Sequence, residues 1–142
     1  MRGLRILLVL DAAVLFWLGV AFIAAPGHIA ALFGFRDLPT GVHYLIGMWG
    51  CVLATMALGY AVAASDPLRH VVWVQVGIAR GTLECLFGLI GVLRGVVTWQ
   101  QAGFGTLVAA LVALAYLALY PRVRPALASA AAAPATAAGE GG

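Results

Sequence analysis

Residues 70–95, HVVWVQVGIARGTLECLFGLIGVLRG, are long enough to cross a bilayer as one helix, yet they carry Arg80 and Glu84 near the middle. On a helix of about 3.6 residues per turn, both charges share a stripe with every glycine of the segment. The stripe consists of His70, Trp73, Gly77, Arg80, Gly81, Glu84, Gly88, Gly91 and Gly95. Small residues permit close helix contact and charges avoid lipid, so this stripe is predicted to face the protein interior.

The composition of the 142-residue chain indicates a membrane protein. Hydrophobic residues make up 64% of the chain and charged residues only 9%, and the mean hydropathy is +1.06. A water-soluble core of this size cannot bury that much apolar surface, so the lipid bilayer is an expected partner. The net charge of +3 comes from basic residues that lie mostly at the ends of apolar runs. This pattern is typical of an oriented membrane protein, and nucleic acid is not an expected partner.

Four apolar runs separated by turn signals predict four transmembrane helices. Their expected bounds are residues 4–25, 41–64, 69–93 and 102–120. Asp11 interrupts the first run and no clear cleavage site follows it, so we interpret this run as a retained helix and not as a signal peptide. The connection between the first two helices mixes apolar and polar residues, which favours a short amphipathic segment at the membrane interface.

The predicted fold is all-α, with the four helices in an up-down-up-down bundle, because short connections make consecutive helices antiparallel neighbours. Residues 1–125 are expected to form this single transmembrane domain. Residues 126–142 are rich in Ala, Gly and Pro and offer no face for packing. They are predicted to be a disordered tail.

The arginines that flank the predicted helices are unequally distributed between the two sides of the membrane. One side holds Arg2, Arg5, Arg69, Arg122 and Arg124, and the other holds Arg36 and Arg94. By the positive-inside rule, both termini are expected in the cytoplasm. The expected location is the plasma (inner) membrane, as a multi-pass protein.

Glycine-rich faces on the second and third helices predict where the bundle packs closely. The second helix offers Gly47, Gly50, Cys51, Ala54, Ala57 and Ala61 on one face, and the third offers Gly77, Gly81, Gly88, Gly91 and Gly95. We expect these two faces to meet, or one of them to meet another protomer. Ordinary close packing is the preferred interpretation.

Three charged residues within the predicted spans need a common explanation. At about 1.5 Å per residue, Asp11 lies roughly 10 Å and Arg80 roughly 15 Å from the cytoplasmic ends of their helices. Helical side chains lean toward the N-terminus, so Arg80 is expected to reach the depth of Asp11. Glu84 follows Arg80 by one turn on the same face. We predict a cluster of Asp11, Arg80 and Glu84 between the first and third helices, to which Thr55 can add a hydroxyl.

Two interpretations of this cluster stay open. The preferred one is that these ionic contacts are structural and fix the register of the helices. However, the three charges sum to minus one when all are ionised, so a proton relay or a cation-binding acid is the alternative.

The remaining polar residues give no pattern for catalysis or metal binding. His28, His43 and His70 share neither a helix nor a ligand spacing, so no metal site is predicted. Cys51 and Cys85 fall at similar depths and could touch, although apolar packing is the favoured interpretation. Tyr60, near the end of the second helix, suits the headgroup level. The sequence contains no recognised catalytic motif, so no catalytic residue and no cofactor are predicted, and an enzyme is not the favoured interpretation.

The first helix that ends at Pro26, the piece Leu32-Phe33-Gly34, and Gly47 and Gly50 on the second helix resemble small bacterial four-helix membrane proteins grouped as DoxX-like or BphX-like. The resemblance covers residues 4–120 and implies a four-helix membrane fold. Some members of that group are described as accessory subunits of quinone-linked oxidoreductases, and no catalytic residue carries over from them.

Three functions follow as hypotheses. The first is a non-enzymatic accessory or interaction subunit, bound to a membrane-protein partner or to further copies of itself. The second is a proton-coupled small-molecule transporter that uses Asp11 and Glu84. The third, an accessory subunit of a quinone-linked oxidoreductase, rests on the resemblance alone.

Overall fold

The computed structural model describes residues 2–120 and consists of helices and their connections in that range. The helices are α1 (Arg2–Ala24), α2 (Pro26–Leu32), α3 (Thr40–Ser65), α4 (Val71–Leu93) and α5 (Trp99–Leu119). All except α2 are long and apolar enough to cross a membrane. The predicted all-helical fold with four membrane-length helices is therefore confirmed. The predicted tail, residues 126–142, lies outside the described residues.

The observed bounds of the four long helices lie within three residues of the predicted ones. The largest difference is at α5, which begins at Trp99 instead of residue 102. A capping box explains it, because the side chain of Gln101 accepts a hydrogen bond from the backbone N–H of Thr98 at 2.9 Å. The predicted interfacial segment after α1 is the short helix α2, with Pro26 in its first turn, where a missing N–H costs little.

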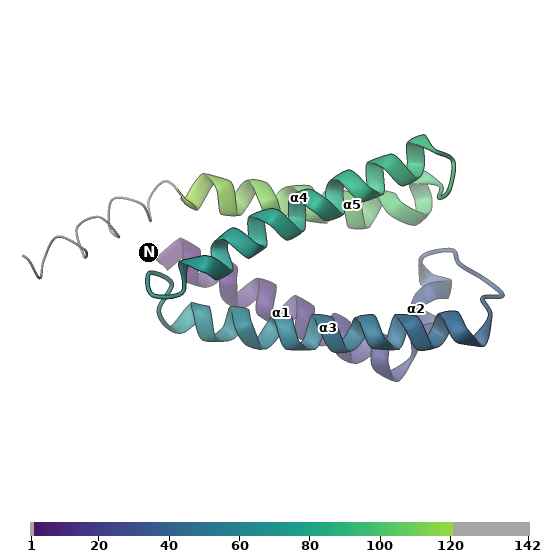
Figure 1. Cartoon of the computed structure of the whole chain (residues 1–142), viewed down its shortest axis with the longest axis horizontal. Coiled ribbons are helices and arrows are strands. Elements are labelled where there is room, and N and C mark those ends of the chain that lie inside the picture. The colour runs from purple at the N-terminus through teal and green to yellow at the C-terminus, as the bar shows by residue number, and fades with distance from the viewer. Residues whose placement is uncertain (1, 121–142) are drawn as a thin grey trace, which may run out of the picture.

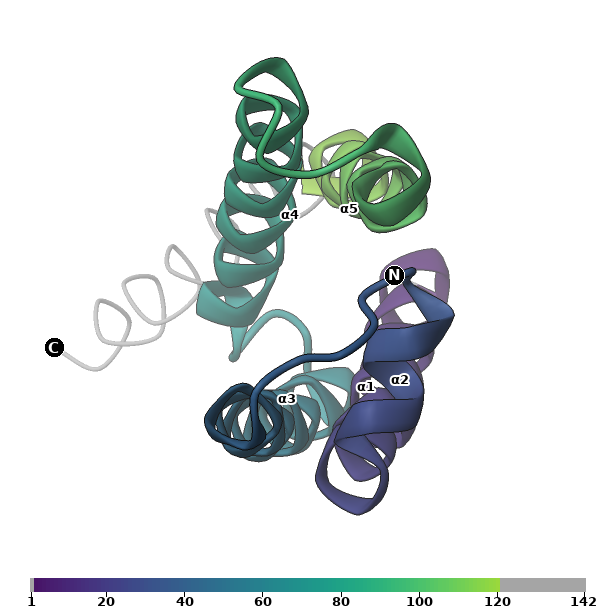
Figure 2. The same ribbon diagram turned by 90° about the vertical axis from the view of Figure 1, so that its right-hand side faces the viewer.

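The four long helices pack as two pairs, α1 with α3 and α4 with α5 (Figures 1 and 2). Glycine sets the closest approach in each pair. A Cβ added to Gly50 of α3 would lie 2.7 Å from the carbonyl oxygen of Gly19 in α1. A Cβ added to Gly81 of α4 would lie 2.7 Å from the carbonyl oxygen of Ala109 in α5. In both pairs the backbones therefore touch directly.

The expectation that the glycine faces of α3 and α4 meet each other is wrong. The glycines of these faces that contact another long helix do so inside their own pair, Gly47 and Gly50 against α1 and three glycines of α4 against α5. A run of small residues shows that a helix is approached closely, but lipid gives no hydrophobic drive that would select which neighbour approaches.

The two pairs come together at one end and diverge toward the other (Figure 1). They meet at the end that holds the start of α1 and the turn between α3 and α4. The largest fully buried side chains there come one from each long helix: Leu8, Tyr60, Val74 and Tyr116. At the opposite end, the side chain of Gln101 donates a hydrogen bond to the carbonyl oxygen of Gly34 at 3.4 Å. The shared core of the two pairs is thus concentrated near the converging end.

Candidate intramembrane ionic site

Asp11, on α1, lies where the two helix pairs meet. Arg80 Nη2, on α4, donates a hydrogen bond to its Oδ1 at 2.8 Å. The Tyr116 hydroxyl, on α5, donates a hydrogen bond to its Oδ2 at 3.0 Å. Both carboxylate oxygens are therefore bonded, and the residue is buried. The predicted contact of Asp11 with Arg80 is present, and it joins one helix pair to the other.

The guanidinium of Arg80 is held on two sides. One nitrogen bonds Asp11, and the group lies over the ring of Tyr60 with Cζ 5.4 Å from the ring centroid. Such a cation–π contact is worth about 2 kcal/mol or more when it is shielded from water. Nε and Nη1 are buried and have no hydrogen-bond partner among the described residues. The guanidinium is thus enclosed by protein but not fully satisfied.

Aromatic rings complete the junction of the helix pairs. Tyr60 stacks on Tyr116 with ring centroids 6.3 Å apart, and it meets Trp73 edge-on at 5.4 Å. The ring of Tyr60, which the sequence placed at the headgroup level, is fully buried in the protein and contacts side chains of α4 and α5. Tyr116 was not predicted as a site residue. The sequence does carry a signal for the burial of Tyr116. The buried positions of α5 recur every three or four residues, at Thr106, Ala109, Ala113 and Tyr116.

Glu84 is placed differently from the other two charges. Its Oε1 lies 3.8 Å from Arg80 Nε, an ion pair without a hydrogen bond. Its side chain is 44% exposed, against 13% for Arg80 and 5% for Asp11. The neighbouring large side chains Leu83 and Phe87 are exposed as well. The predicted cluster of three charges is therefore an enclosed pair, Asp11 and Arg80, with Glu84 at its open edge.

Thr55 does not join the cluster, contrary to the prediction. Its side chain is exposed, and its hydroxyl donates to the carbonyl oxygen of Val52 one turn earlier at 2.8 Å. A threonine inside an apolar helix commonly satisfies its hydroxyl in this way. The hydroxyl of Thr55 therefore needs no hydrogen-bond partner on another helix.

The predicted packing glycines divide into two groups. Gly77, Gly81 and Gly88 of α4 lie against Tyr116, Ala109 and Thr106 of α5, respectively. Gly47 and Gly50 of α3 face α1. Gly91 and Gly95 do not pack another helix. The nearest atom to a Cβ at Gly91 belongs to Val97 in the following connection, and at Gly95 no atom lies within 4 Å. Since α4 ends at Leu93, Gly95 lies in the turn that follows it, where its φ of 68° is a conformation that glycine adopts without strain.

The cysteines and the metal-ligand residue types add no second site in the described chain. Cys51 is exposed, Cys85 is partly buried, and both are free thiols. Among residues 2–120, no group of three His, Cys, Asp or Glu side chains is placed to hold a metal ion.

No protein-family model, curated protein or solved structure matches this chain. The DoxX-like or BphX-like resemblance stays a prediction, and so does the quinone-linked role that it implies. The ionic site and its surroundings are therefore the basis for inferring the function.

Proposed function

We propose that the protein is a non-enzymatic interaction subunit of the plasma (inner) membrane, which binds a helix of a different membrane protein along the exposed side of α4 around Glu84. In this proposal the long helices cross in an up-down-up-down order with both termini in the cytoplasm. The arginine distribution supports the orientation. Hydrogen bonds from Arg5 to the carbonyl oxygens of Ala64 and Ser65 support the order, because they hold the start of α1 beside the end of α3.

The half-exposed carboxylate of Glu84 carries this proposal. It lies within a membrane-length helix, between exposed apolar side chains. A charge in that setting costs about 2.5–3.5 kcal/mol on insertion scales. Arg80 offsets only part of this cost, because its hydrogen bond goes to Asp11 and its Nε lies 3.8 Å from Glu84 Oε1. A hydrogen-bond donor on a neighbouring helix would offset it, and such polar contacts stabilise helix association in lipid.

Charge complementarity favours a different protein over a second copy of this chain. The partner helix must present a basic side chain at the depth of Glu84, because only a cation balances its charge. Within the described helices, Arg80 is the only arginine away from a helix end, and it is already paired with Asp11. A second copy therefore has no free arginine to offer at that depth. We assign the surface to a partner helix that carries Lys, Arg or His in its span.

Changing Glu84 to glutamine is expected to release the partner while leaving this protein folded. The change removes the charge and keeps the side-chain size, and Asp11 retains both of its donors. The measurement is co-purification from native membranes in a mild detergent. Asp37→Asn, the same type of change in the exposed connection between α2 and α3, is the matched control and should keep the partner bound.

The partner's identity is tested with a photo-crosslinking residue placed at position 87. Phe87 is 81% exposed and lies one turn from Glu84. The cross-linked helix should contain a basic residue whose change to glutamine also breaks the complex. A crosslinker at position 111, on the exposed side of α5, should not capture this helix. The proposal is wrong when Glu84→Gln retains the partner, or when only a second copy of this chain is captured.

Proton-coupled transport is the second candidate function. One observation favours it: Glu84 lies beside an arginine with two buried nitrogens that have no hydrogen-bond partner among the described residues. Protein reconstituted in liposomes with a trapped pH-sensitive dye should then move protons when a lipophilic amine is added, and Glu84→Gln should abolish that signal. A dye signal that is equal in wild-type and Glu84→Gln liposomes would reject this candidate.

A further inference from the structure

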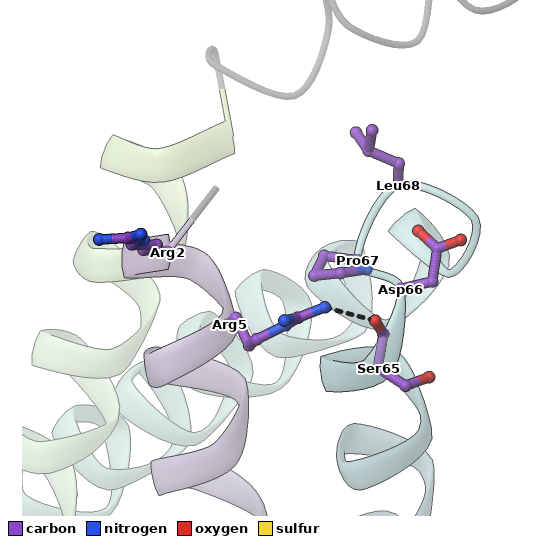
Figure 3. A pocket seen from close by; sticks show the side chains of 6 residues that line it. All are labelled: Arg2, Arg5, Ser65, Asp66, Pro67 and Leu68. Carbon is purple, nitrogen blue, oxygen red and sulfur yellow. Dashed lines mark hydrogen bonds between the residues drawn. The ribbon is translucent and has the colours of Figure 1, made fainter.

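A second polar site lies at the end of the molecule where α1 begins and α3 turns into α4. There the structure has a cavity of about 380 Å³, within the usual range of small-molecule sites of about 300–1,000 Å³ (Figure 3). The residues that line it are Arg2, Arg5, Ser65, Asp66, Pro67 and Leu68. Because the apolar span of α1 starts at this point, the cavity lies at the headgroup level of a surrounding bilayer.

The two arginines that line this cavity differ in whether their guanidinium groups are already hydrogen-bonded. Arg5 is fixed, with Nε 2.8 Å from the carbonyl oxygen of Ala64 and Nη2 2.7 Å from that of Ser65. Arg2 makes no side-chain hydrogen bond or ion pair with the described residues, so its guanidinium is available to a ligand. Arg5 thus builds the wall of the cavity, and Arg2 lies at its rim, with its guanidinium turned away from the turn between α3 and α4 (Figure 3).

Asp66 is the one acidic group in the cavity wall. Its Oδ1 accepts a hydrogen bond from the backbone N–H of Arg69 at 3.3 Å. This bond holds the carboxylate against the backbone between α3 and α4. Figure 3 shows Arg2 and Asp66 at opposite sides of the cavity. The first N–H groups of α1, which have no partner inside the helix, add positive potential on the Arg2 side. The side near Arg2 is therefore suited to an anion, while Pro67 and Leu68 supply apolar contact.

We infer that this cavity binds the phosphate group of an anionic phospholipid, with Arg2 as the principal ligand. Basic pockets between transmembrane helices at the cytoplasmic surface hold anionic headgroups in this way. The apolar residues of the turn would meet the glycerol and upper acyl region, which a soluble phosphate lacks. The inference does not depend on the function proposed for Glu84, because the two surfaces involve different residues.

The experiment compares the melting temperature of purified full-length protein in neutral micelles after three additions: phosphatidylglycerol, phosphatidylcholine or inorganic phosphate. A ligand that binds the folded state raises the melting temperature. Phosphatidylglycerol is expected to raise it, and phosphatidylcholine is not, because its choline cation offsets the charge of its phosphate. Arg2→Gln should weaken the affinity for phosphatidylglycerol about fivefold, as expected for one arginine at an anionic membrane surface. Native mass spectrometry of the same samples should show the retained lipid.

The control variant is Arg36→Gln, which removes an exposed arginine in the connection between α2 and α3. It should bind phosphatidylglycerol as the wild type does. A shift with inorganic phosphate equal to that with phosphatidylglycerol would show that the anion comes from solution and would overturn the lipid assignment. Equal losses in Arg2→Gln and Arg36→Gln, or no shift with any addition, would overturn the site.

Discussion

Arg80→Gln is expected to lower the free energy of unfolding by about 3–5 kcal/mol, the usual cost of removing one partner from a buried ion pair. The carboxylate of Asp11 would stay buried between α1, α4 and α5 with only the Tyr116 hydroxyl to bond it. The cation–π contact with Tyr60 would be lost at the same time. Since these contacts join the two helix pairs, their loss should loosen the whole junction. Unfolding in mixed micelles with increasing denaturing detergent measures the change.

A double variant separates the ion pair from general damage. Asp11→Asn together with Arg80→Gln removes both charges, so it should be clearly more stable than Arg80→Gln alone. Arg36→Gln, in an exposed connection, should unfold like the wild type. An Arg80→Gln protein as stable as the wild type would refute the enclosed pair, and so would a double variant no better than the single one.

Gly50→Ala is expected to lower the free energy of unfolding by about 1–3 kcal/mol, as overpacking of a close contact does. The new Cβ would lie 2.7 Å from the Gly19 carbonyl oxygen and 2.9 Å from the Phe22 Cβ. Neither atom is the end of a flexible side chain, so α1 and α3 must move apart. The unfolding assay in mixed micelles measures this change as well.

Gly105→Ala is the matched control, because it makes the same substitution inside α5 where no atom lies within 4 Å. Alanine favours a helix over glycine by up to about 1 kcal/mol, so this variant should be at least as stable as the wild type. Opposite signs at positions 50 and 105 would distinguish steric contact from helix propensity. Equal effects at the two positions would contradict the packing of α1 against α3.

The helices and the ion pair could be predicted because each depends on local rules. Runs of apolar residues define membrane-length helices, and the turn signals place their ends within three residues. The contact of Asp11 with Arg80 followed from the rise of a helix and from the lean of its side chains. Both quantities are fixed by backbone geometry and do not depend on which helices become neighbours.

The pairing of the helices could not be predicted in the same way. Small residues permit close approach to any neighbour, so the partners of the α3 and α4 faces stayed undetermined. Tyr60 and Tyr116 lie near the ends of α3 and α5, where tyrosine usually marks the interface. They are buried because the helix pairs converge at that end. The divergence at the other end is a tertiary property too, and it leaves Glu84 half-exposed although the sequence predicted that it would be enclosed.

The different surroundings of the two carboxylates are the centre of this account, and a lipid-soluble carbodiimide tests them most directly. The reagent adds to protonated carboxyl groups that it reaches from the membrane, and mass spectrometry of peptides locates the adduct. In purified protein without a partner, we expect modification of Glu84, none of Asp11, and loss of the adduct in Glu84→Gln. Modification of Asp11, or a wild-type protein in which Glu84 stays unmodified, would contradict it.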